Sequence, residues 1–230
     1  MTRRFGLLGY PLSHSFSKKY FTEKFEKEKL EDCIYENFER RESSAVFILF
    51  DDYYDLKGLN VTIPHKQSII RWLESVDNTA RVIGAVNCIK RFKVKDDFEL
   101  RGYNTDAWGF EKAVKPFLQP HHQRALILGT GGSARAVAYA LQELGLEYSY
   151  VSRYPTMTDF TYESLDKSII NDFQVIVNCT PLGMFPGILT LPSIPYQFFS
   201  DKHLLFDLVY NPEETEFLKK GKQFGATVSN

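Results

Sequence analysis

The clearest sign of chemistry is a glycine-rich turn between an apolar, strand-like run at residues 125–128 and a helix-patterned segment at residues 133–144. A glycine directly after a strand permits a tight turn, and further glycines let backbone N–H groups approach a ligand closely. The start of the helix adds unpaired N–H donors and the positive end of the helix dipole. This order of elements predicts a site for a pyrophosphate. Its residues are Gly129, Gly131, Gly132, Ser133 and Ala134, the alanine standing where a third glycine often sits.

A second apolar run, residues 148–151, follows that helix and ends in Ser152 and Arg153. Sites for NAD usually carry an acidic residue at the end of this second strand, where it binds the ribose hydroxyls, whereas an arginine there accommodates the 2′-phosphate of NADP. Arg153 therefore indicates NADP. The alternative is a surface arginine on an ordinary βαβ unit, but the spacing and the context agree and favour the nucleotide.

Polar clusters also follow other strand patterns. Three alternating serines, Ser13, Ser15 and Ser17, stand just before a helix pattern. Their hydroxyls and the first N–H groups of the helix can surround an anion such as a carboxylate. They can equally well cap the helix, and the pattern alone does not decide between the two interpretations.

The segment at residues 59–66 is more informative. Alternation along the strand puts Asn60 and Thr62 on one face, Pro64 ends the strand, and Lys66 begins the next helix pattern. A cation at the start of a helix opposes the helix dipole, so a lysine kept there is often held by a carboxylate or takes part in chemistry. The alternative is an exposed lysine whose ammonium extends into water.

Two more polar residues stand at strand ends, Asn87 and Asp106, and each of them can also be a simple helix cap. In the half of the chain with the glycine-rich turn, residues 178–184 follow another strand pattern. They offer a turn, with Thr180 and Met184, whose backbone can border a nicotinamide.

The composition excludes several classes of partner. The 230 residues include 28 Lys and Arg against 29 Asp and Glu, a net charge of −1, which indicates neither a nucleic-acid surface nor an acidic tail. No run approaches the ~18 apolar residues of a membrane span. The N-terminus lacks the apolar core and the cleavage site of a signal peptide. We therefore expect no nucleic-acid partner and no membrane association.

The cysteines and histidines also bound the function. Cys33, Cys88 and Cys179 are odd in number, form no C-x-x-C pair and sit in apolar patterns, so we expect buried free thiols in a reducing cytoplasm. The five histidines show no metal-ligand spacing, and we expect no metal. His121 and His122 lie in a proline-flanked linker and are expected to be solvated.

Short apolar runs alternate with amphipathic segments along the whole chain. Strands are predicted at residues 5–8, 34–38, 59–63, 86–92, 99–103, 125–128, 148–152, 175–178 and 204–208, with the pair 86–92 and 99–103 forming a hairpin around residues 95–97. Helices are predicted at residues 17–30, 43–50, 66–76, 106–118, 133–144, 162–169 and 212–224.

This alternation predicts an α/β protein with parallel sheets in both halves and a cleft between them. We expect two domains: an N-terminal α/β domain over residues 1–105 that binds the substrate and carries the catalytic residues, and a C-terminal Rossmann-like NADP-binding domain over residues 121–230. Residues 106–120 are expected to form a connecting helix and linker. In open α/β sheets ligands bind beyond the carboxyl ends of the strands, which is where the polar clusters stand.

Seven segments together resemble the shikimate dehydrogenase family, in the family's order and over nearly the whole chain: residues 9–17, 60–66, 84–87, 104–106, 129–134, 178–184 and 207–212. The most specific is the signature Asn-Val-Thr-x-Pro-x-Lys at residues 60–66. The resemblance implies an enzyme that reduces 3-dehydroshikimate to shikimate with NADPH, a step of the chorismate pathway to aromatic amino acids. It implies a small-molecule substrate and a monomer or homodimer.

The resemblance also implies a role for each matching residue. Lys66 and Asp106 are the implied catalytic pair. A lysine near its reference pKa of about 10.4 is a poor base at neutral pH but a good cation for stabilising an alkoxide. We therefore interpret Lys66 as the proton donor, with Asp106 as the carboxylate that keeps it charged and oriented.

The other implied contacts divide between substrate and cofactor. Ser15, Ser17 and Tyr210 are implied for the substrate carboxylate, and Asn60, Thr62 and Asn87 for the rest of the substrate pocket. The implied cofactor residues are Gly129, Gly131, Gly132, Ser133 and Ala134 for the pyrophosphate, Ser152 and Arg153 for the 2′-phosphate, and Thr180 and Met184 beside the nicotinamide.

Three departures from the family pattern bear on these expectations. Lys18 stands where the family usually has proline, and it either adds a positive charge near the implied carboxylate site or points to solvent. No second arginine follows Arg153 within residues 154–159, so the preference for NADP is expected to be weaker. Relatives also continue beyond the position of Asn230 into a closing helix with a glutamine that contacts the substrate. From this difference we expect either weaker substrate binding, domain closure or stability, or an incomplete chain.

Other activities fit parts of the pattern. A quinate/shikimate dehydrogenase with relaxed cofactor choice is the nearest, although Ser152 and Arg153 argue against a form specific for NAD. A non-catalytic ligand-binding relative is a second alternative, against which Lys66 and Asp106 argue. A folate dehydrogenase shares the two-domain plan but is disfavoured by the serine cluster and by residues 60–66.

Overall fold

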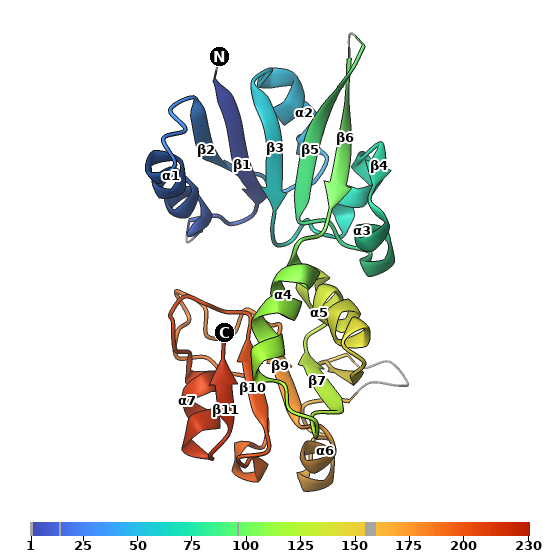
Figure 1. Cartoon of the computed structure of the whole chain (residues 1–230), viewed down its shortest axis with the longest axis vertical. Helices are drawn as coiled ribbons and strands as arrows, with labels where there is room; N and C mark the ends of the chain where they lie inside the picture. Colours follow the sequence, from blue (N-terminus) through green and yellow to red (C-terminus); the bar gives the residue numbers. More distant parts are fainter. Residues whose placement is uncertain (1, 14, 96, 155–159) are drawn as a thin grey trace. The chain divides into compact units, whose positions relative to one another are not determined.

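Residues 2–13, 15–95, 97–154 and 160–230 are described by the computed structural model, and the chain divides into two units, Met1–Thr105 and Asp106–Asn230 (Figure 1). The tip of the predicted hairpin at residue 96 and residues 155–159 of the segment after Arg153 lie outside the described residues.

The sheet of the first unit has the strand order β2-β1-β3-β5-β6-β4. Its strands are β1 (Arg3–Gly9), β2 (Cys33–Glu39), β3 (Leu56–Val61), β4 (Ser75–Val76), β5 (Cys88–Val94) and β6 (Asp97–Tyr103). Its helices are α1 (Ser17–Lys27), α2 (Ala45–Asp52), α3 (Asn78–Ile83) and the 3-10 helix η1 (Ser68–Trp72). Most predicted elements of this half are confirmed, whereas α3 and β4 are not among them.

The expectation of a parallel sheet is wrong for this unit. β1 runs parallel to β2 and β3, but β5 is antiparallel to both β3 and β6. The short connection between β5 and β6 accounts for the second pair, because two neighbouring strands joined by so few residues can only run antiparallel, and this pair is the predicted hairpin.

The predicted helix at residues 66–76 is also wrong. In an α-helix the carbonyl of Lys66 would accept from the N–H of Ile70, but here it accepts from the N–H of Val86 at 2.7 Å. The chain instead forms the short helix η1, and Ser75 and Val76 then pair with β6. Contacts with segments remote in sequence have therefore overridden the helical pattern.

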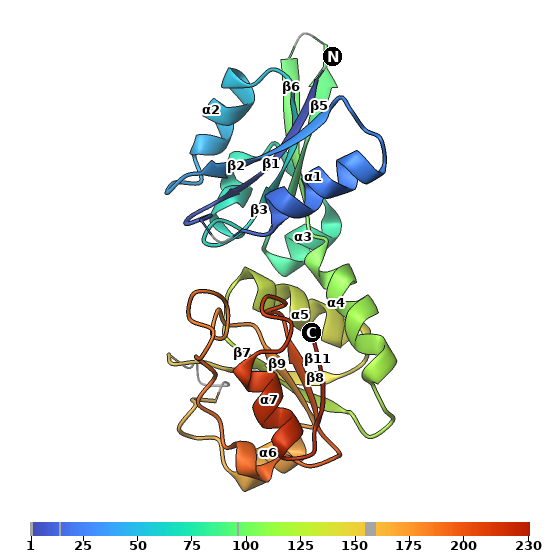
Figure 2. The same ribbon diagram turned by 90° about the vertical axis from the view of Figure 1, so that its left-hand side faces the viewer.

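Helices cover both faces of the first sheet, and Figure 2 shows α1 and α2 on opposite sides of it. Successive strand residues point to opposite faces. Leu7 accordingly packs with Phe21 and Phe25 of α1, whereas the next residue, Leu8, belongs to the cluster that includes residues of α2.

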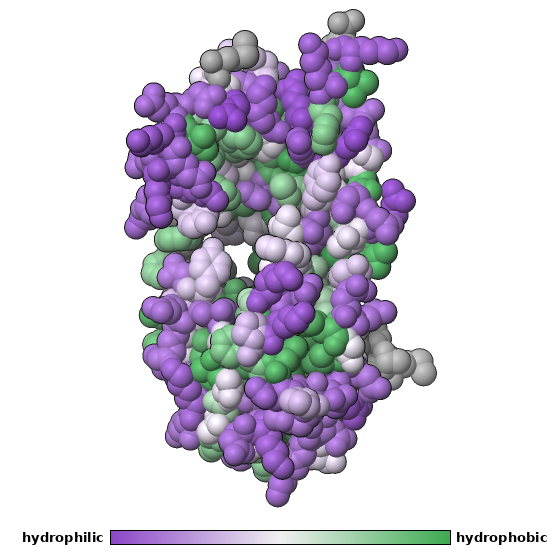
Figure 3. Space-filling view, in the orientation of Figure 1, coloured by the Kyte–Doolittle hydropathy of each residue, from purple (hydrophilic) through white to green (hydrophobic). Residues whose placement is uncertain are grey.

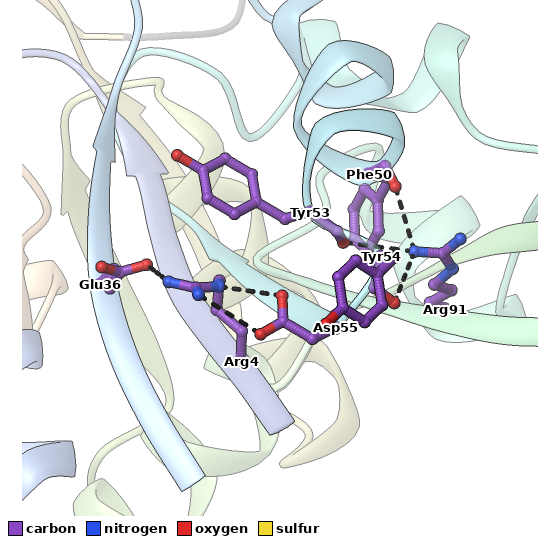
Figure 4. A network of polar contacts seen from close by, with 7 residues as sticks. All are labelled: Arg4, Glu36, Phe50, Tyr53, Tyr54, Asp55 and Arg91. Atoms are coloured by element: carbon purple, nitrogen blue, oxygen red, sulfur yellow. Dashed lines mark hydrogen bonds and ion pairs between the residues drawn. The ribbon is translucent and has the colours of Figure 1, made fainter. Parts of the chain in front are cut away.

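Charged side chains tie together the amino ends of β1 and β3 (Figure 4). Arg4 of β1 pairs with Glu36 of β2 and, at 3.0 Å, with Asp55 just before β3. Arg91 of β5 donates to the backbone carbonyl of Phe50 at 3.1 Å, at the carboxyl end of α2, where a cation is favoured by the helix dipole. This network stabilises the amino edge of the sheet and leaves the opposite edge to the polar clusters.

In the second unit all five strands are parallel, in the order β11-β10-β9-β7-β8. They are β7 (Arg124–Leu128), β8 (Glu147–Val151), β9 (Val175–Asn178), β10 (Leu204–Asp207) and β11 (Thr227–Ser229). The helices are α4 (Asp106–Val114), α5 (Gly132–Glu143), α6 (Lys167–Asp172) and α7 (Glu216–Gln223), with the 3-10 helices η2 (Lys115–Phe117) and η3 (Tyr196–Phe198). This is a doubly wound sheet, as the sequence predicts.

Helices cover both faces of this sheet as well. Phe206 of β10 meets Phe110 of α4 edge-on, with ring centroids 5.2 Å apart. Its neighbour Leu205 points the other way and belongs to the cluster with Phe217 and Leu218 of α7.

Two helix starts in this unit differ from the prediction. The helix predicted at residues 162–169 is α6, which begins only after Asp166, whose side chain accepts from the N–H of Ile169 at 2.9 Å. The helix predicted at residues 212–224 begins at Glu216, because the side chain of Thr215 caps it. Both caps are short polar side chains of the kind that begin helices.

His122 is buried, with 6% of its surface exposed, so the expectation that it is solvated is wrong. Its Nδ1 accepts from the N–H of Gln119 at 3.0 Å, which leaves Nε2 to donate to the carbonyl of Lys202 at 3.2 Å. His121 remains exposed and reaches the same carbonyl at 3.1 Å. The linker is therefore fastened to the loop before β10.

The visible face of each unit is largely hydrophilic, with smaller hydrophobic groups between the hydrophilic residues (Figure 3), and the three cysteines are free. Among the described residues, no helix is long and apolar enough to cross a membrane. The same residues contain no group of three or more His, Cys, Asp or Glu that could hold a metal ion. Cys33, Cys88 and Cys179 are free but only partly buried, less so than expected.

Candidate active site

Three backbone hydrogen bonds bring the polar segments of the first unit to one edge of its sheet. The N–H of Thr62 donates to the carbonyl of Leu8 at 2.9 Å, and that of Val61 donates to the carbonyl of Asn87 at 2.8 Å. The N–H of Asn87 in turn donates to the carbonyl of Tyr103 at 3.0 Å. The ends of β1, β3 and β6 and the start of β5 therefore lie side by side, as the strand directions require.

Asn87 is held from both ends of its amide by Thr105. Its Oδ1 accepts from the backbone N–H of Thr105 at 2.9 Å, and its Nδ2 donates to the hydroxyl of the same residue at 2.9 Å. A backbone N–H can only donate, so the orientation of the amide is fixed. Sequence reasoning missed Thr105, although it stands inside the segment 104–106.

Asn60, near the end of β3, is held by a second residue that the sequence analysis missed. The hydroxyl of Tyr35 donates to Oδ1 of Asn60 at 2.8 Å. The ring of Tyr35 stacks on Phe21 of α1 at a centroid distance of 4.5 Å. The helix that begins at Ser17 is thus packed against the residue that orients Asn60.

Lys66 lies in a turn before η1, not at the start of an α-helix. The argument from the helix dipole is therefore wrong for this lysine, because a five-residue 3-10 helix has little dipole to oppose. His65 before it is buried, with its Nε2 2.8 Å from the carbonyl of Arg40. This turn is anchored on both sides, which fixes the backbone from which the Lys66 side chain extends.

Ser15 and Ser17 stand after β1, at the start of α1. The N–H of Ser17 donates to Oγ of Ser15 at 3.3 Å, a local side-chain contact two residues back, while α1 itself has no side-chain cap. Thr62 lies one residue beyond β3, with its methyl group against Gly9, where an added Cβ would come within 2.4 Å. Asp106 follows Thr105 directly and is the first residue of α4, in the second unit.

In the second unit the predicted cofactor residues also meet at one edge, the carboxyl edge of the parallel sheet. The N–H of Gly129 donates to the carbonyl of Val151 at 2.9 Å, and that of Cys179 donates to the carbonyl of Leu128 at 3.0 Å. The chain runs from β7 outward to β8 and then returns to β9 on the other side of β7. This is a topological switch point, where doubly wound sheets form their ligand crevice.

The glycine-rich turn has the geometry of an anion site. Gly129 has φ +102°, a conformation that favours glycine. Gly131 precedes α5, which begins at Gly132, and a Cβ added to Gly131 would meet nothing within 4 Å. Ser133 follows in the first turn, and Ala134 is fully buried. Open space before the N-terminus of a twelve-residue helix fits a pyrophosphate.

Ser152 and Arg153 follow β8 directly. The hydroxyl of Ser152 accepts from the N–H of Tyr154 at 3.1 Å. Arg153 is exposed, and its guanidinium lies 5.9 Å from the centroid of the Tyr154 ring. Burial raises the pKa of nearby Tyr162, and the charge of Arg153 opposes that rise. An exposed cation at this position fits a 2′-phosphate.

Thr180 and Met184 belong to the turn after β9. Asn178 anchors it, because its Oδ1 accepts from the N–H of Thr180 at 3.1 Å and from its hydroxyl at 2.7 Å. The side chain of Thr180 also faces the glycine-rich turn, since a Cβ on Gly129 would lie 3.3 Å from its methyl group. Met184 is 44% exposed, and Tyr210, in the loop after β10, is 60% exposed.

Apart from Asp106, the candidate residues of each unit therefore follow or border strands at one edge of its sheet. The first holds Ser15, Ser17, Asn60, Thr62, Lys66 and Asn87. The second holds Asp106, Gly129, Gly131, Gly132, Ser133, Ala134, Ser152, Arg153, Thr180, Met184 and Tyr210, all but Asp106 after β7, β8, β9 or β10. Sequence reasoning gave no role to Asn178, Asp207 and Thr215, which are buried beneath the second edge.

Known proteins show the same organisation. Residues 7–89 match the family model described as the shikimate dehydrogenase substrate binding domain. A shikimate dehydrogenase (NADP(+)) of Carboxydothermus hydrogenoformans is 36% identical over all of this chain and 86% of its own length. That of Desulforamulus reducens is 33% identical, covering 98% of this chain and 83% of its own.

Solved structures agree with these relatives. The shikimate 5-dehydrogenase of Thermus thermophilus, in complex with NADP(H) and shikimate, superposes with a TM-score of 0.83 at 31% identity, covering 100% of this chain and 87% of its own. The enzyme from Listeria monocytogenes, in complex with shikimate and NAD, superposes with a TM-score of 0.79 at 26% identity, covering 99% of this chain and 85% of its own.

Proposed function

Because this chain belongs to the shikimate dehydrogenase family, we propose that it interconverts 3-dehydroshikimate and shikimate with NADP(H), in the chorismate pathway to aromatic amino acids. The observation that carries the proposal is the glycine-rich turn at the switch point of the second sheet, with open space at Gly131 and an exposed arginine after the next strand. Relatives named as NADP-dependent shikimate dehydrogenases favour this activity over quinate oxidation or a non-catalytic binding role.

In this proposal residues 121–230 hold NADP(H), residues 1–105 hold the substrate, and residues 106–120 connect them. The pyrophosphate is held at Gly129, Gly131, Gly132, Ser133 and Ala134, and the 2′-phosphate at Ser152 and Arg153. Thr180 and Met184 border the nicotinamide. When bound, NADPH supplies a hydride to the carbonyl carbon, and NADP⁺ accepts it in the reverse direction.

Lys66 and Asp106 supply the proton chemistry. In reduction the ammonium of Lys66 stabilises the alkoxide oxygen that develops on the substrate and donates a proton to it. The carboxylate of Asp106 favours the charged form of the lysine and orients it. In oxidation the proton of the substrate hydroxyl returns to the pair formed by Lys66 and Asp106.

The remaining residues orient the substrate. Ser15, Ser17 and Tyr210 bind its carboxylate, and Asn60, Thr62 and Asn87 bind the hydroxyl groups of its ring. Orientation of this kind brings the carbonyl and the hydride donor into a reactive arrangement and contributes directly to the rate. We further propose a monomer or homodimer in the cytoplasm, a compartment that keeps three free thiols reduced.

The test follows the absorbance of NADPH as NADP⁺ is reduced in the presence of shikimate. We expect turnover with shikimate and NADP⁺, slower turnover with NAD⁺ and little with quinate. Absence of turnover with shikimate under either cofactor would refute the proposal, and comparable rates with both acids would replace it with a quinate/shikimate dehydrogenase.

A further inference from the structure

A buried carboxylate lies beneath the cofactor edge of the second unit. Asp207 is the last residue of β10, and only 1% of its surface is exposed. Its Oδ1 accepts from Nδ2 of Asn178 and from the N–H of Val209, both at 2.9 Å. Its Oδ2 accepts from the hydroxyl of Thr215 at 2.6 Å. Asn178 and Thr215 are themselves fully buried.

The surroundings of Asp207 fix the orientation of its carboxyl group. Among the described residues its Oδ1 contacts the N–H of Val209 and the amide nitrogen of Asn178, which can only donate, so Oδ1 must accept. The hydroxyl of Thr215 can donate to Oδ2 or accept from it, so this contact fits both the ionised and the protonated acid. Burial raises the pKa of Asp207, and the three hydrogen bonds oppose that rise. Tyr196 of η3 is a titratable neighbour of Asp207. Its burial raises its pKa well above the ordinary value, and the charge of Asp207 raises it further, so Tyr196 stays neutral.

The network reaches two segments that face the cofactor edge. Through Asn178 it reaches Thr180, which donates both its N–H and its hydroxyl to the same amide oxygen. Through the N–H of Val209 it holds the loop that continues into Tyr210. Thr215 also packs against the turn, since a Cβ added to Gly183 would lie 3.3 Å from the Cβ of Thr215.

We infer that Asp207, acting through Asn178, is a positioning residue that fixes the turn at residues 179–184 for the nicotinamide end of the cofactor. Asp207 touches neither reacting group and acts by holding Asn178, which in turn holds Thr180. The inference rests on the proposed function for the identity of the ligand. The coupling between carboxylate and turn is a property of the protein alone.

The sharpest test is Asn178→Asp, which keeps the shape of the side chain and the acceptor for Thr180 but replaces the donor to Asp207 by a second carboxylate. Two carboxylates this close cannot both be ionised without moving apart, and one of them acquires a raised pKa. At pH 6 a shared proton restores the hydrogen bond between them. At pH 9 the pair is doubly charged, and the turn is released.

We expect the dissociation constant of NADP⁺, measured by calorimetry, to be near that of the wild type at pH 6 and about tenfold higher at pH 9, as for the loss of a hydrogen bond to a charged group. Hydrogen–deuterium exchange of peptides covering residues 179–184, without any ligand, should exceed that of the wild type at pH 9 and match it near pH 6. General damage to the fold would weaken NADP⁺ binding and speed exchange to the same extent at both pH values.

A comparison variant is Thr215→Val, which removes a hydrogen bond from Oδ2 of the same carboxylate but keeps the Cβ and the methyl group that pack against Gly183. It should speed exchange at the start of α7 and change residues 179–184 less than Asn178→Asp does at pH 9. If Asn178→Asp does not fold, Asn178→Ser removes the same donor without adding charge and should weaken NADP⁺ binding equally at both pH values.

The outcomes separate the inference from the proposed function. Exchange in residues 179–184 that equals the wild type at pH 9, in whichever Asn178 variant folds, overturns the inference. A wild-type protein without turnover of shikimate overturns the proposed function instead, while the exchange measurement still decides whether Asp207 holds the turn.

Discussion

At the scale of the residue, Lys66 lies in a turn and not, as the sequence indicates, at the start of an α-helix. In this turn its carbonyl accepts a hydrogen bond from the N–H of Val86, the residue before Asn87. The charge of Lys66 is therefore not opposed by a helix dipole, and the proposed role of this lysine rests on its motif. If that role is correct, the loss of Lys66 affects the chemical step more than binding.

Lys66→Ala is expected to lower kcat by about 10²- to 10⁴-fold, the usual contribution of a general acid, while KM for shikimate changes far less. Steady-state kinetics with saturating NADP⁺ measure both constants. Lys19→Ala, an exposed lysine on α1, is the matched control and should behave as the wild type. An unchanged kcat in Lys66→Ala would remove this residue from the mechanism.

Gly131 provides a test of the cofactor site that leaves the fold intact. Its φ of −73° and ψ of −177° suit any residue, and an added Cβ meets nothing within 4 Å. Gly131→Ala should therefore keep its melting temperature within about 2 °C, since substitutions without a structural cost change stability little. The new methyl group fills the space proposed for the pyrophosphate, so the dissociation constant of NADP⁺ should rise at least about tenfold.

The comparison for that variant is Gly109→Ala, a helix-interior glycine whose added Cβ also meets nothing within 4 Å. It should stabilise α4 by up to about 1 kcal/mol and leave NADP⁺ binding unchanged. If calorimetry gives the same affinity for Gly131→Ala and the wild type, the pyrophosphate lies elsewhere.

At the scale of the element, the longer strands were predictable, whereas the short strands β4 and β11, the helix α3 and the 3-10 helix η1 were not. Central strands such as β7 and β9 are continuous apolar runs, and the sequence places them within a residue. The segment at residues 66–76 carries an equally good helical pattern, but its course is decided by Val86 and by β6, which lie well beyond any local window. β11 likewise exists only because β10 offers it an edge.

His122 shows how contacts with residues remote in sequence change the titration of a side chain, because it is buried against the carbonyl of Lys202. Burial, and then the neighbouring His121, lower its pKa from 6.5. The unfolded chain therefore binds a proton at a higher pH than the folded one, and protonation favours unfolding. Stability should fall as the pH drops through 6.5, and the loss should be complete once the pH passes the lowered folded-state value.

The measurement is the free energy of unfolding in urea between pH 8 and pH 5. The slope due to this group should not exceed about 1.4 kcal/mol per pH unit, the limit for a single proton. His122→Asn keeps an acceptor for the N–H of Gln119 but is too short to reach the carbonyl of Lys202. It should therefore be less stable at pH 8 and show a shallower decline. Equal slopes for the two proteins would exclude His122 as the source.

At the scale of the whole molecule, the α/β class and the sheet edge at which most candidate residues lie followed from the sequence for one physical reason. Parallel strands bring their carboxyl ends to a common edge, so residues that follow separate strands meet without any knowledge of the loops. The contacts that hold them were not predictable, because the partners of Thr105, Tyr35 and Asp207 are remote in sequence. Thr105 and Asp207 stand inside the segments 104–106 and 207–212, but neither their type nor their spacing indicates which residue each one holds.

Each unit has its own hydrophobic core, so each ligand should protect its own unit. We expect NADP⁺ to slow hydrogen exchange at residues 129–134 and 178–184, and shikimate to slow it at residues 60–66 and 85–87. At a concentration one hundred times its dissociation constant, either ligand should stabilise the unit that binds it by about 2.7 kcal/mol. Gly131→Ala should abolish the protection by NADP⁺ at moderate concentration and preserve that by shikimate. Exchange at residues 129–134 that is unaffected by saturating NADP⁺ in the wild type would contradict the division of binding between the two units.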